Sequence, residues 1–265
     1  MSPLLNNTLF ENVSFSSEDF TKHYHDTYTI GLTYKGVLKS YNANQCYDSY
    51  EYSVRINNPG EVHAGKSKEW SHANFYPSIE MMSNLYEEIF GEKKIPCFER
   101  HIVENKPLFI KLHNFFDAYF KNEDEILIES LLIDALSTLI LESTIYTKRY
   151  KEIFEDKRII KDTYEFINDS IDTNFTLDAL AKNVSLSKYH FLRMFKKDFG
   201  LTPHAFIINE RLNRANKLIQ NGIPIGEASI QVGFSDQSHY SRNFKKYFGY
   251  TPISLKRNSN IILYK

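Results

Sequence analysis

A basic, aromatic stretch occurs twice in the C-terminal part of this sequence. The first copy, HFLRMFKKDFGLTP, occupies residues 190–203, and the second, HYSRNFKKYFGYTP, occupies residues 239–252. When 17 positions are aligned from the start of each copy, nine are identical, which indicates an internal duplication. Each copy keeps one arginine and two lysines at fixed spacing. A guanidinium group can bind a guanine edge with two hydrogen bonds, and both cations can bind phosphates, so this chemistry suits nucleic acid.

Helical geometry separates each copy into two faces. At 100° per residue, large apolar residues gather into one stripe in both copies. The stripe comprises Phe191, Met194, Phe195 and Phe199 in the first copy, and Tyr240, Phe244, Tyr247 and Phe248 in the second. The opposite face is polar and basic, as in a recognition helix whose N-terminal part meets base edges. A solvated cationic face of an ordinary helix bundle is the alternative, but two matched copies favour DNA binding.

A short turn and another helical segment precede each copy. The predicted helices are 176–184 and 224–232, and the predicted turns are 185–187 and 233–236. Each unit therefore reads helix, short turn, helix, which is the outline of a helix-turn-helix. The expected N-cap residues are Thr176, Ser187 and either Ser235 or Asp236, and the expected left-handed residues at the helix ends are Gly200 and Gly249.

Charge divides the 265 residues into two parts with opposite signs. Residues 157–265 contain 17 Lys and Arg against 9 Asp and Glu, a net charge of +8, whereas residues 1–156 carry −9. A basic module suits a polyanionic partner, with a chance imbalance as the plain alternative. Two cysteines give no disulfide framework, and we identify neither a signal peptide nor a stretch able to span a bilayer. We therefore expect a cytoplasmic protein without membrane contact.

Residues 158–258 resemble the AraC/XylS family of transcription regulators. The residues that carry the resemblance are LAKNVSLSKYHFLRMFKKDFGLTPHAF at 180–206 and VGFSDQSHYSRNFKKYFGYTPISLKR at 232–257, the latter similar to the family signature. Two small departures are Ser229, where the family usually has Ala, and Ser185, where it often has Gly. The resemblance implies two helix-turn-helix units joined by a long helix at about 203–220. It also implies that two recognition helices enter successive major-groove segments of double-stranded DNA.

The same resemblance implies roles for individual side chains. The implied base contacts are Lys188, Tyr189, Leu192 and Arg193 in the first unit, and Gln237, Ser238, His239 and Arg242 in the second. The implied phosphate contacts are Ser187, Lys196, Lys197, Lys245 and Lys246. Base contacts set the sequence preference, whereas phosphate contacts set affinity and its dependence on salt.

Residues 10–77 follow a β pattern. The runs 28–34 and 52–56 alternate apolar residues with small or polar ones, as half-buried strands do. The turn signals that separate the strands lie at 35–36, 42–45 and 57–61. Short strands at this spacing predict a small barrel or sandwich.

Residues 78–150 change to a helical period. One helix is expected from Pro107, and another over 126–140 carries apolar residues on more than one face. One face can cover the β part, while the other can meet a second subunit or be buried within the same chain. We expect a homodimer that forms through the helices in 105–146.

Two histidine motifs in the β part resemble those of cupin barrels. A His-x-His sequence is followed by a Pro-Gly-x-x-His sequence that ends at His63. In metal-binding cupins the ligands would be His23, His25, a glutamate a few residues on, and His63. Here Thr29 and Ile30 stand where that glutamate should be, although three imidazoles can still hold a divalent ion with an open position. Because the carboxylate is missing, we expect pocket lining or core hydrogen bonding instead, with no metal and no other cofactor.

The AraC/XylS resemblance extends more weakly to this N-terminal part. Many family members carry an N-terminal cupin-like domain that binds a small effector, followed by helices that dimerise. The candidate pocket residues are His25, Tyr28, Tyr34, Arg55 and His63, and the alternative for each is a place in the core or on the surface. Trp70, the single tryptophan, either gates this pocket or only packs.

The expected fold is α+β. A cupin-like β-barrel with a helical dimerisation segment precedes an all-α domain of two helix-turn-helix units. The expected domains are 1–150 for effector binding and dimerisation, 151–157 as a linker, and 158–265 for DNA binding.

The predicted function is that of a sequence-specific DNA-binding transcription regulator that responds to a small-molecule effector. The expected partners are double-stranded DNA, the effector, a second copy of the chain and, as a candidate, RNA polymerase. Two alternatives stay open. One is a metal-dependent cupin enzyme with an appended DNA-binding domain, and the other is a regulator whose N-terminal domain only dimerises. The missing glutamate argues against the enzyme, and we find no Walker-type loop, Cys-rich zinc site or Ser/His/Asp motif, so we expect no enzymatic activity.

Overall fold

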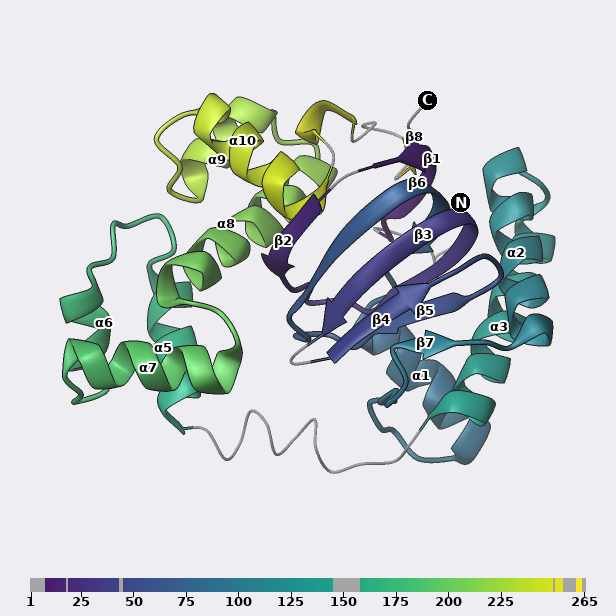
Figure 1. Cartoon of the computed structure of the whole chain (residues 1–265), viewed down its shortest axis with the longest axis horizontal. Helices are drawn as coiled ribbons and strands as arrows, with labels where there is room; N and C mark the ends of the chain where they lie inside the picture. Colours follow the sequence, from purple (N-terminus) through teal and green to yellow (C-terminus); the bar gives the residue numbers. More distant parts are fainter. Residues whose placement is uncertain are drawn as a thin grey trace.

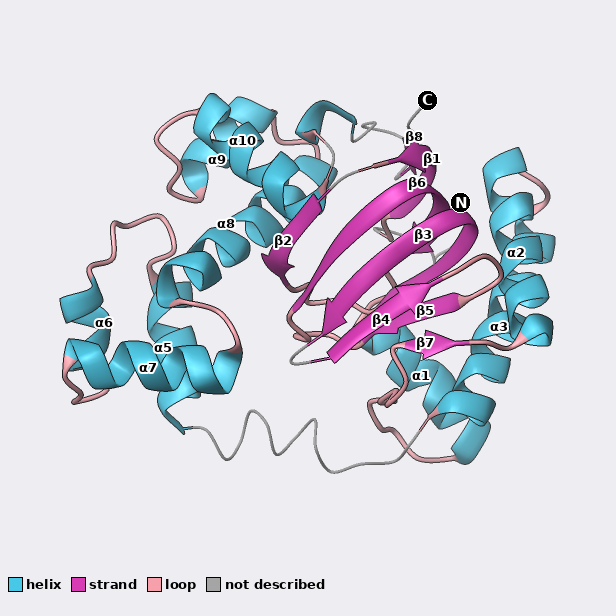
Figure 2. Ribbon diagram, viewed as in Figure 1, coloured by secondary structure: helices cyan, strands magenta, loops and turns pink. Residues whose placement is uncertain are grey.

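A mainly antiparallel sheet and an all-helical part make up the chain. The structure, a computed structural model, describes residues 8–17, 19–42, 45–144, 158–249, 251–254 and 261–263. Three helices cover one side of the sheet, and the remaining described helices form a separate group on its other side (Figure 1). Colouring by secondary structure separates the two parts (Figure 2), and the predicted α+β class is confirmed. The predicted linker, 151–157, lies outside the described residues.

Eight strands form a single sheet in the described chain. They are β1 (Phe10–Ser16), β2 (Asp19–His23), β3 (Thr29–Asn42), β4 (Gln45–Ser49), β5 (Val54–Asn57), β6 (His63–Phe75), β7 (Ile102–Val103) and β8 (Ile261–Leu263). The order is β7-β5-β3-β6-β1-β8, with β2 paired to β6 and β4 paired to β3. The two long strands, β3 and β6, are antiparallel neighbours from the Ile30–Phe75 pair to the Asn42–His63 pair, and together they form the frame of the sheet.

A bulge, where the sequence predicts a turn, bends these two long strands. The turn expected at 35–36 is wrong, because β3 continues through this point to Asn42. Gly36 has a φ of 74° and Glu69 on β6 has a φ of 49°, and the register between the strands shifts at this place. A Cβ atom on Gly36 would lie 2.3 Å from the Glu69 carbonyl oxygen, so only glycine fits without movement. The strands therefore bend here instead of reversing, and the sheet is curved (Figure 1). Residues of this curved sheet line a cavity.

Helices α1 (Ile79–Phe90), α2 (Lys106–Lys121) and α3 (Glu125–Ser143) pack against the outside of the sheet. The helices expected from Pro107 and over 126–140 correspond to α2 and α3. Asn105 caps α2 by accepting a hydrogen bond from the Leu108 N–H at 3.0 Å. The core between the layers contains Phe75 of the sheet with Phe115 and Phe116 of α2, and the aromatic rings of these residues are in contact.

The C-terminal part contains two helix-turn-helix units, as predicted. The first comprises α6 (Leu177–Asn183) and α7 (Lys188–Phe199), preceded by α5 (Arg158–Asp169), and the second comprises α9 (Ile225–Gln231) and α10 (Gln237–Phe248). The long helix α8 (Pro203–Gln220) joins them (Figure 1), and a short 3-10 helix, Pro252–Ser254, follows α10. Within the described ranges, no helix is both long and apolar enough to cross a membrane.

Local hydrogen bonds cap α6 and α10 at predicted residues. Thr176 caps α6 by accepting from the Ala179 N–H at 3.1 Å, and Asp236 caps α10 by accepting from the His239 N–H at 2.7 Å. The glycines that follow α7 and α10, Gly200 and Gly249, have φ values of 80° and 84°.

The turn inside each unit requires a left-handed residue. Gly233 fills that position in the second unit with a φ of 90°, whereas Ser185 fills it in the first with a φ of 56°. A side chain in this region is sterically disfavoured by about 1 kcal/mol, so the departure from glycine at Ser185 costs some stability. The other departure, Ser229, is buried, and its hydroxyl donates to the Gly226 carbonyl at 2.7 Å.

The helical part is docked on the β part through specific contacts. Asn209 of α8 is fully buried and pairs with the backbone of Tyr24: its Oδ1 accepts from Tyr24 N at 3.1 Å, and its Nδ2 donates to Tyr24 O at 2.9 Å. The Tyr24 hydroxyl donates to Glu210, and Lys217 forms an ion pair with Asp26. These contacts fix the segment after β2 against α8.

Candidate functional site

The outward sides of α7 and α10 are open to solvent. The exposed members of the predicted DNA-contact set are Ser187, Lys188, Leu192, Lys196 and Lys197 in the first unit, and Gln237, Ser238, Arg242, Lys245 and Lys246 in the second. His239 is half-buried, with Nδ1 3.2 Å from Ser235 Oγ and its ring against Phe234. The side chains of Tyr189 and Arg193 lie outside the described part of the structure. The described residues of the set are thus accessible to a large partner, with His239 the least exposed of them.

The apolar stripe predicted on each recognition helix packs into the core of its own helix-turn-helix unit. Phe191 and Phe195 are buried in a cluster that also contains Tyr24 of the β part. Tyr240, Phe244, Tyr247 and Phe248 are buried in a second cluster that also contains Leu9 of the β part. Met194 and Phe199 are half-buried. Each recognition helix therefore has an apolar inner side and a polar or basic outer side.

Arg211 of α8 holds the turn inside the second helix-turn-helix unit in place. It was not identified as a functional residue from the sequence. Its guanidinium group is buried and donates to three backbone carbonyls: Ile171 at 2.9 Å, Gly233 at 2.7 Å and Thr173 at 2.6 Å. Gly233 is the left-handed turn residue of the second unit, and a Cβ there would lie 2.8 Å from Arg211 Nη2. One sequence signal could have identified Arg211: this charged residue lies on the same buried face of α8 as the apolar residues Ile207, Ile208, Leu212 and Ala215.

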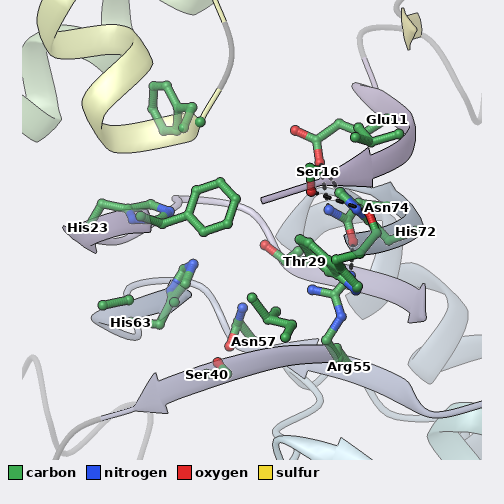
Figure 3. A pocket seen from close by; sticks show the side chains of 18 of the residues that line it. Glu11, Ser16, His23, Thr29, Ser40, Arg55, Asn57, His63, His72 and Asn74 are labelled. Carbon is green, nitrogen blue, oxygen red and sulfur yellow. Dashed lines mark hydrogen bonds and ion pairs between the residues drawn. The ribbon is translucent and has the colours of Figure 1, made fainter. Parts of the chain in front are cut away.

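A cavity of about 310 Å³ lies inside the curved sheet. His23 and His63 lie at one end of it, and Arg55, His72, Asn74 and Glu11 lie at the other (Figure 3). Of the five predicted pocket residues, His25, Arg55 and His63 line this cavity. Its size suits a small ligand, since ligand pockets commonly begin at about 300 Å³.

Tyr28 and Tyr34 do not line the cavity, so their assignment to the pocket is wrong. Tyr28 is fully buried in the core and its hydroxyl donates to the Pro96 carbonyl at 2.6 Å. Tyr34 packs against Phe109 and His113 of α2. Successive residues of a strand point to opposite faces, and these tyrosines share the helix-covered face with Ile30. Thr29, on the opposite face, lines the cavity instead.

Four residues that line the cavity each contain a buried polar atom that has no hydrogen-bond partner within the described chain. The atoms are Thr29 Oγ1, Arg55 Nε, Asn57 Oδ1 and His72 Nδ1. Most buried polar groups in proteins are paired, because an unpaired one costs about 1–3 kcal/mol. Four such atoms on residues around one cavity, with both donors and acceptors among them, are groups that a polar ligand or ordered water can pair with.

A network of charged and aromatic groups holds Arg55 in place at the end of the cavity opposite His23 and His63 (Figure 3). Arg55 Nη2 donates to Asn74 Oδ1 at 2.6 Å, and Asn74 Nδ2 donates to Glu11 Oε2 at 2.5 Å. The guanidinium lies 4.5 Å from the centre of the Trp70 ring, and the His72 ring is stacked on the same tryptophan with ring centres 3.5 Å apart. Burial lowers the pKa of Arg55 to about 10 and that of His72 to about 4, so at pH 7 the arginine is charged and the histidine is neutral.

The three histidines of the two motifs meet at the other end. Their potential ligand nitrogens all lie within 4.8 Å of one another. Burial holds the pKa of His23 and of His25 well below the ordinary value and lowers the pKa of His63 to about 4. All three rings are therefore neutral at pH 7.

Helix α10 completes the wall of the cavity beside these histidines. Phe248, its last residue, and the following Gly249 line the cavity. The Phe248 ring is stacked on His25, with ring centres 5.5 Å apart, and it lies edge-on to His23 at 5.8 Å. Thr21 of β2 donates a hydrogen bond to the Lys246 carbonyl at 3.0 Å. A ligand in the cavity would thus touch the same helix that carries Arg242.

Comparison with known protein families assigns each part of the chain. The model for an AraC-like ligand binding domain matches residues 11–136, and the model for a helix-turn-helix domain matches residues 180–258. The uncharacterized HTH-type transcriptional regulator YbfI of Bacillus subtilis is 30% identical over 227 residues, which cover 84% of this chain and 82% of that protein. The arabinose operon regulatory protein of Salmonella typhimurium is 26% identical over 238 residues, which cover 86% and 83% of the two chains.

A solved structure has the same arrangement of domains. A single-substitution variant of apo ToxT from Vibrio cholerae superposes with a TM-score of 0.61 over 93% of this chain and 94% of that one. Its sequence identity is 17%, so the likeness concerns the fold alone. The sheet domain and the helix-turn-helix region thus occur together in a known fold.

Proposed function

The chain belongs to the AraC family of transcription regulators, and we propose that a small polar effector, bound in the cavity between the sheet and α10, controls how it binds DNA. The observation that carries this proposal is the set of four buried polar atoms without a partner in the described chain, all on residues of a cavity whose wall includes Phe248 and Gly249. Occupancy of the cavity alters the contacts of the end of α10, and these contacts position the second recognition helix. RNA polymerase stays a predicted partner.

The lining groups specify the chemistry of the effector. Arg55 Nε requires an acceptor, Asn57 Oδ1 requires a donor, and the Thr29 hydroxyl can serve as either. Glu11 lies in the same network as Arg55, so the cavity does not present an isolated positive charge. A small molecule that bears hydroxyl groups, with or without a carboxylate, fits this set. The Trp70 ring supplies one apolar wall.

Trp70 provides a direct test, because it is the single tryptophan and lines the cavity. A panel of small hydroxylated metabolites is titrated against the full chain while Trp70 emission is followed. DNA affinity is then measured with and without each compound that changes the emission. We expect at least one such compound to shift DNA affinity by about 5- to 150-fold, the usual range of allosteric coupling. A compound that binds without any shift would contradict the proposal.

Phe248→Leu should uncouple effector binding from DNA binding. Leucine keeps most of the buried volume but removes the aromatic face stacked on His25. The effector-induced shift in DNA affinity should fall toward onefold, while the effector still binds with little change in affinity. Phe244→Leu is the matched control, because Phe244 is buried one turn earlier in α10 and does not line the cavity. If Phe248→Leu responds to the effector as fully as Phe244→Leu does, α10 does not transmit the signal.

We further propose that the chain forms a homodimer through α2 and α3. Several large apolar side chains on these helices are exposed: Ile110, Ile126, Leu127, Ile133 and Leu141. Ile126 is 75% exposed and Leu141 is 61% exposed. The helices lie on the side of the sheet away from the helix-turn-helix units, so pairing here leaves the DNA-contact surfaces free (Figure 1). Apolar surface of this kind is typical of interaction sites.

The double variant Ile126→Asp/Ile133→Asp should be monomeric. These residues are two turns apart on one exposed side of α3, and two carboxylates there would have to be desolvated in a dimer. Sedimentation velocity measures the mass of the assembly. The control is Ile230→Asp, which changes an exposed isoleucine of α9 and should leave the dimer intact. A wild-type chain that sediments as a monomer at micromolar concentration would refute the dimer.

A further inference from the structure

The histidine cluster has the form of a metal site, and among the residues that the structure describes no carboxylate belongs to it. His23 ends β2, His25 follows it in the loop, and His63 begins β6 directly opposite His23 in the strand register. The rings lie close together, with centres 4.3 Å apart for His23 and His63, 5.0 Å for His23 and His25, and 5.3 Å for His25 and His63. One nitrogen of each ring lies within 4.8 Å of the others.

We propose that His23, His25 and His63 bind one divalent transition-metal ion of the zinc type, with an open coordination position that faces the cavity. This inference goes beyond the proposed regulation by an effector and does not depend on it. Three imidazoles and one open position are a ligand set that zinc proteins use. Imidazole nitrogens favour zinc, copper, nickel and iron over magnesium or calcium, which prefer oxygen ligands.

Hydrogen bonds already orient two of the rings for this task. The Nδ1 atom of His23 lies 2.7 Å from the Thr21 carbonyl, and that of His63 lies 2.9 Å from the Glu61 carbonyl. A carbonyl oxygen can only accept, so each Nδ1 must carry the proton and each Nε2 must carry a free lone pair. Metal-binding histidines are held by the same kind of outer contact. The His25 ring makes no hydrogen bond within the described chain, and it contacts the other two rings and Phe248.

The distances require only a small contraction. A zinc–nitrogen bond of about 2.0–2.1 Å in tetrahedral geometry places two ligand nitrogens about 3.4 Å apart. The separations in the cluster, all within 4.8 Å, would shorten by at most about 1.4 Å, which small rotations of the imidazole rings can supply. The missing glutamate therefore removes one ligand of the cupin set but leaves a sufficient one. The open position would face the cavity, where an oxygen atom of a bound molecule could occupy it.

Metal titration of the full-length chain tests this proposal. The protein is stripped with a chelator, and uptake of Zn²⁺ is measured by competition with a chromophoric chelator and by elemental analysis. In parallel, Co²⁺ is added as a spectroscopic probe, because four- or five-coordinate Co²⁺ absorbs visible light far more strongly than the octahedral ion. We expect one Zn²⁺ per chain and an intense Co²⁺ spectrum. Mg²⁺ should not compete.

Single substitutions assign the ligands. His25→Gln and His63→Gln should each weaken Zn²⁺ binding by at least about 100-fold, since loss of even an outer contact costs about 10- to 100-fold. His113→Gln is the matched control, because this exposed histidine of α2 lies outside the cluster. A wild-type chain that takes up no Zn²⁺ or shows only the weak octahedral Co²⁺ spectrum would overturn the proposal, whether or not the variants fold. Equal Zn²⁺ affinity in folded His25→Gln, His63→Gln and His113→Gln would overturn it as well.

Discussion

Arg242→Ala should weaken binding to the preferred DNA site by about 5- to 150-fold, which corresponds to the loss of about 1–3 kcal/mol from one bidentate arginine–guanine contact. Arg242 is exposed on α10, and the helix that carries it is held by the Asp236 cap. Binding to random DNA should change little, because it depends on the summed phosphate contacts. Competition between a specific and a random duplex at fixed salt measures the discrimination.

Lys245→Ala is the matched comparison for Arg242→Ala. Both residues are exposed on α10, and both border a shallow hollow beside Asp19 of β2. Loss of a phosphate contact should weaken specific and random binding alike and should reduce the slope of log affinity against log salt by about 0.9. If Arg242→Ala behaves in the same way as Lys245→Ala, Arg242 binds phosphate and the proposed base contact is wrong.

Arg211→Ala should destabilise the helical part by about 3 kcal/mol or more, because three backbone carbonyls lose charge-assisted donors in a buried place. The second helix-turn-helix turn at Gly233 would lose its anchor on α8. We expect a lower midpoint in urea unfolding and a loss of specific DNA binding that exceeds the loss caused by Arg242→Ala. Far-ultraviolet circular dichroism follows the unfolding.

Arg214→Ala serves as the control for Arg211→Ala. Arg214 lies on the same helix but is exposed, and it makes two longer contacts with Asn168 at 3.2 Å. Exposed contacts of this kind contribute about 0–1 kcal/mol. Equal destabilisation by the two substitutions would show that the buried carbonyl contacts of Arg211 are not what holds the turn.

Features encoded within a few residues could be predicted from the sequence. The caps at Thr176 and Asp236 and the left-handed ends at Gly200 and Gly249 depend only on neighbouring residues, and the structure has them in place. A single basic helix could equally be a solvated surface helix, but its duplication favoured a pair of DNA-binding units. The resemblance of the two histidine motifs to those of cupin barrels, rather than local information, placed His25 and His63 together, and both line the cavity.

Features that depend on distant partners could not be predicted. Strand alternation placed Tyr28 and Tyr34 on one face, but it does not say which face the helices cover. Gly36 looks like a turn residue, and only its pairing with Glu69 on another strand makes it a bulge. The contact of Phe248 with His25 links segments more than two hundred residues apart and has no local signal.

Selection of binding sites from random duplex DNA by the purified chain tests the central claim most directly. Two recognition helices joined by α8 should select a site with two short conserved blocks, whose centres lie one helical turn, about 10–10.5 base pairs, apart. The block read by α10 should lose its sequence preference in Arg242→Ala while the other block persists. Recovery of no enriched sequence, or of a single block that Arg242→Ala leaves unchanged, would contradict the account.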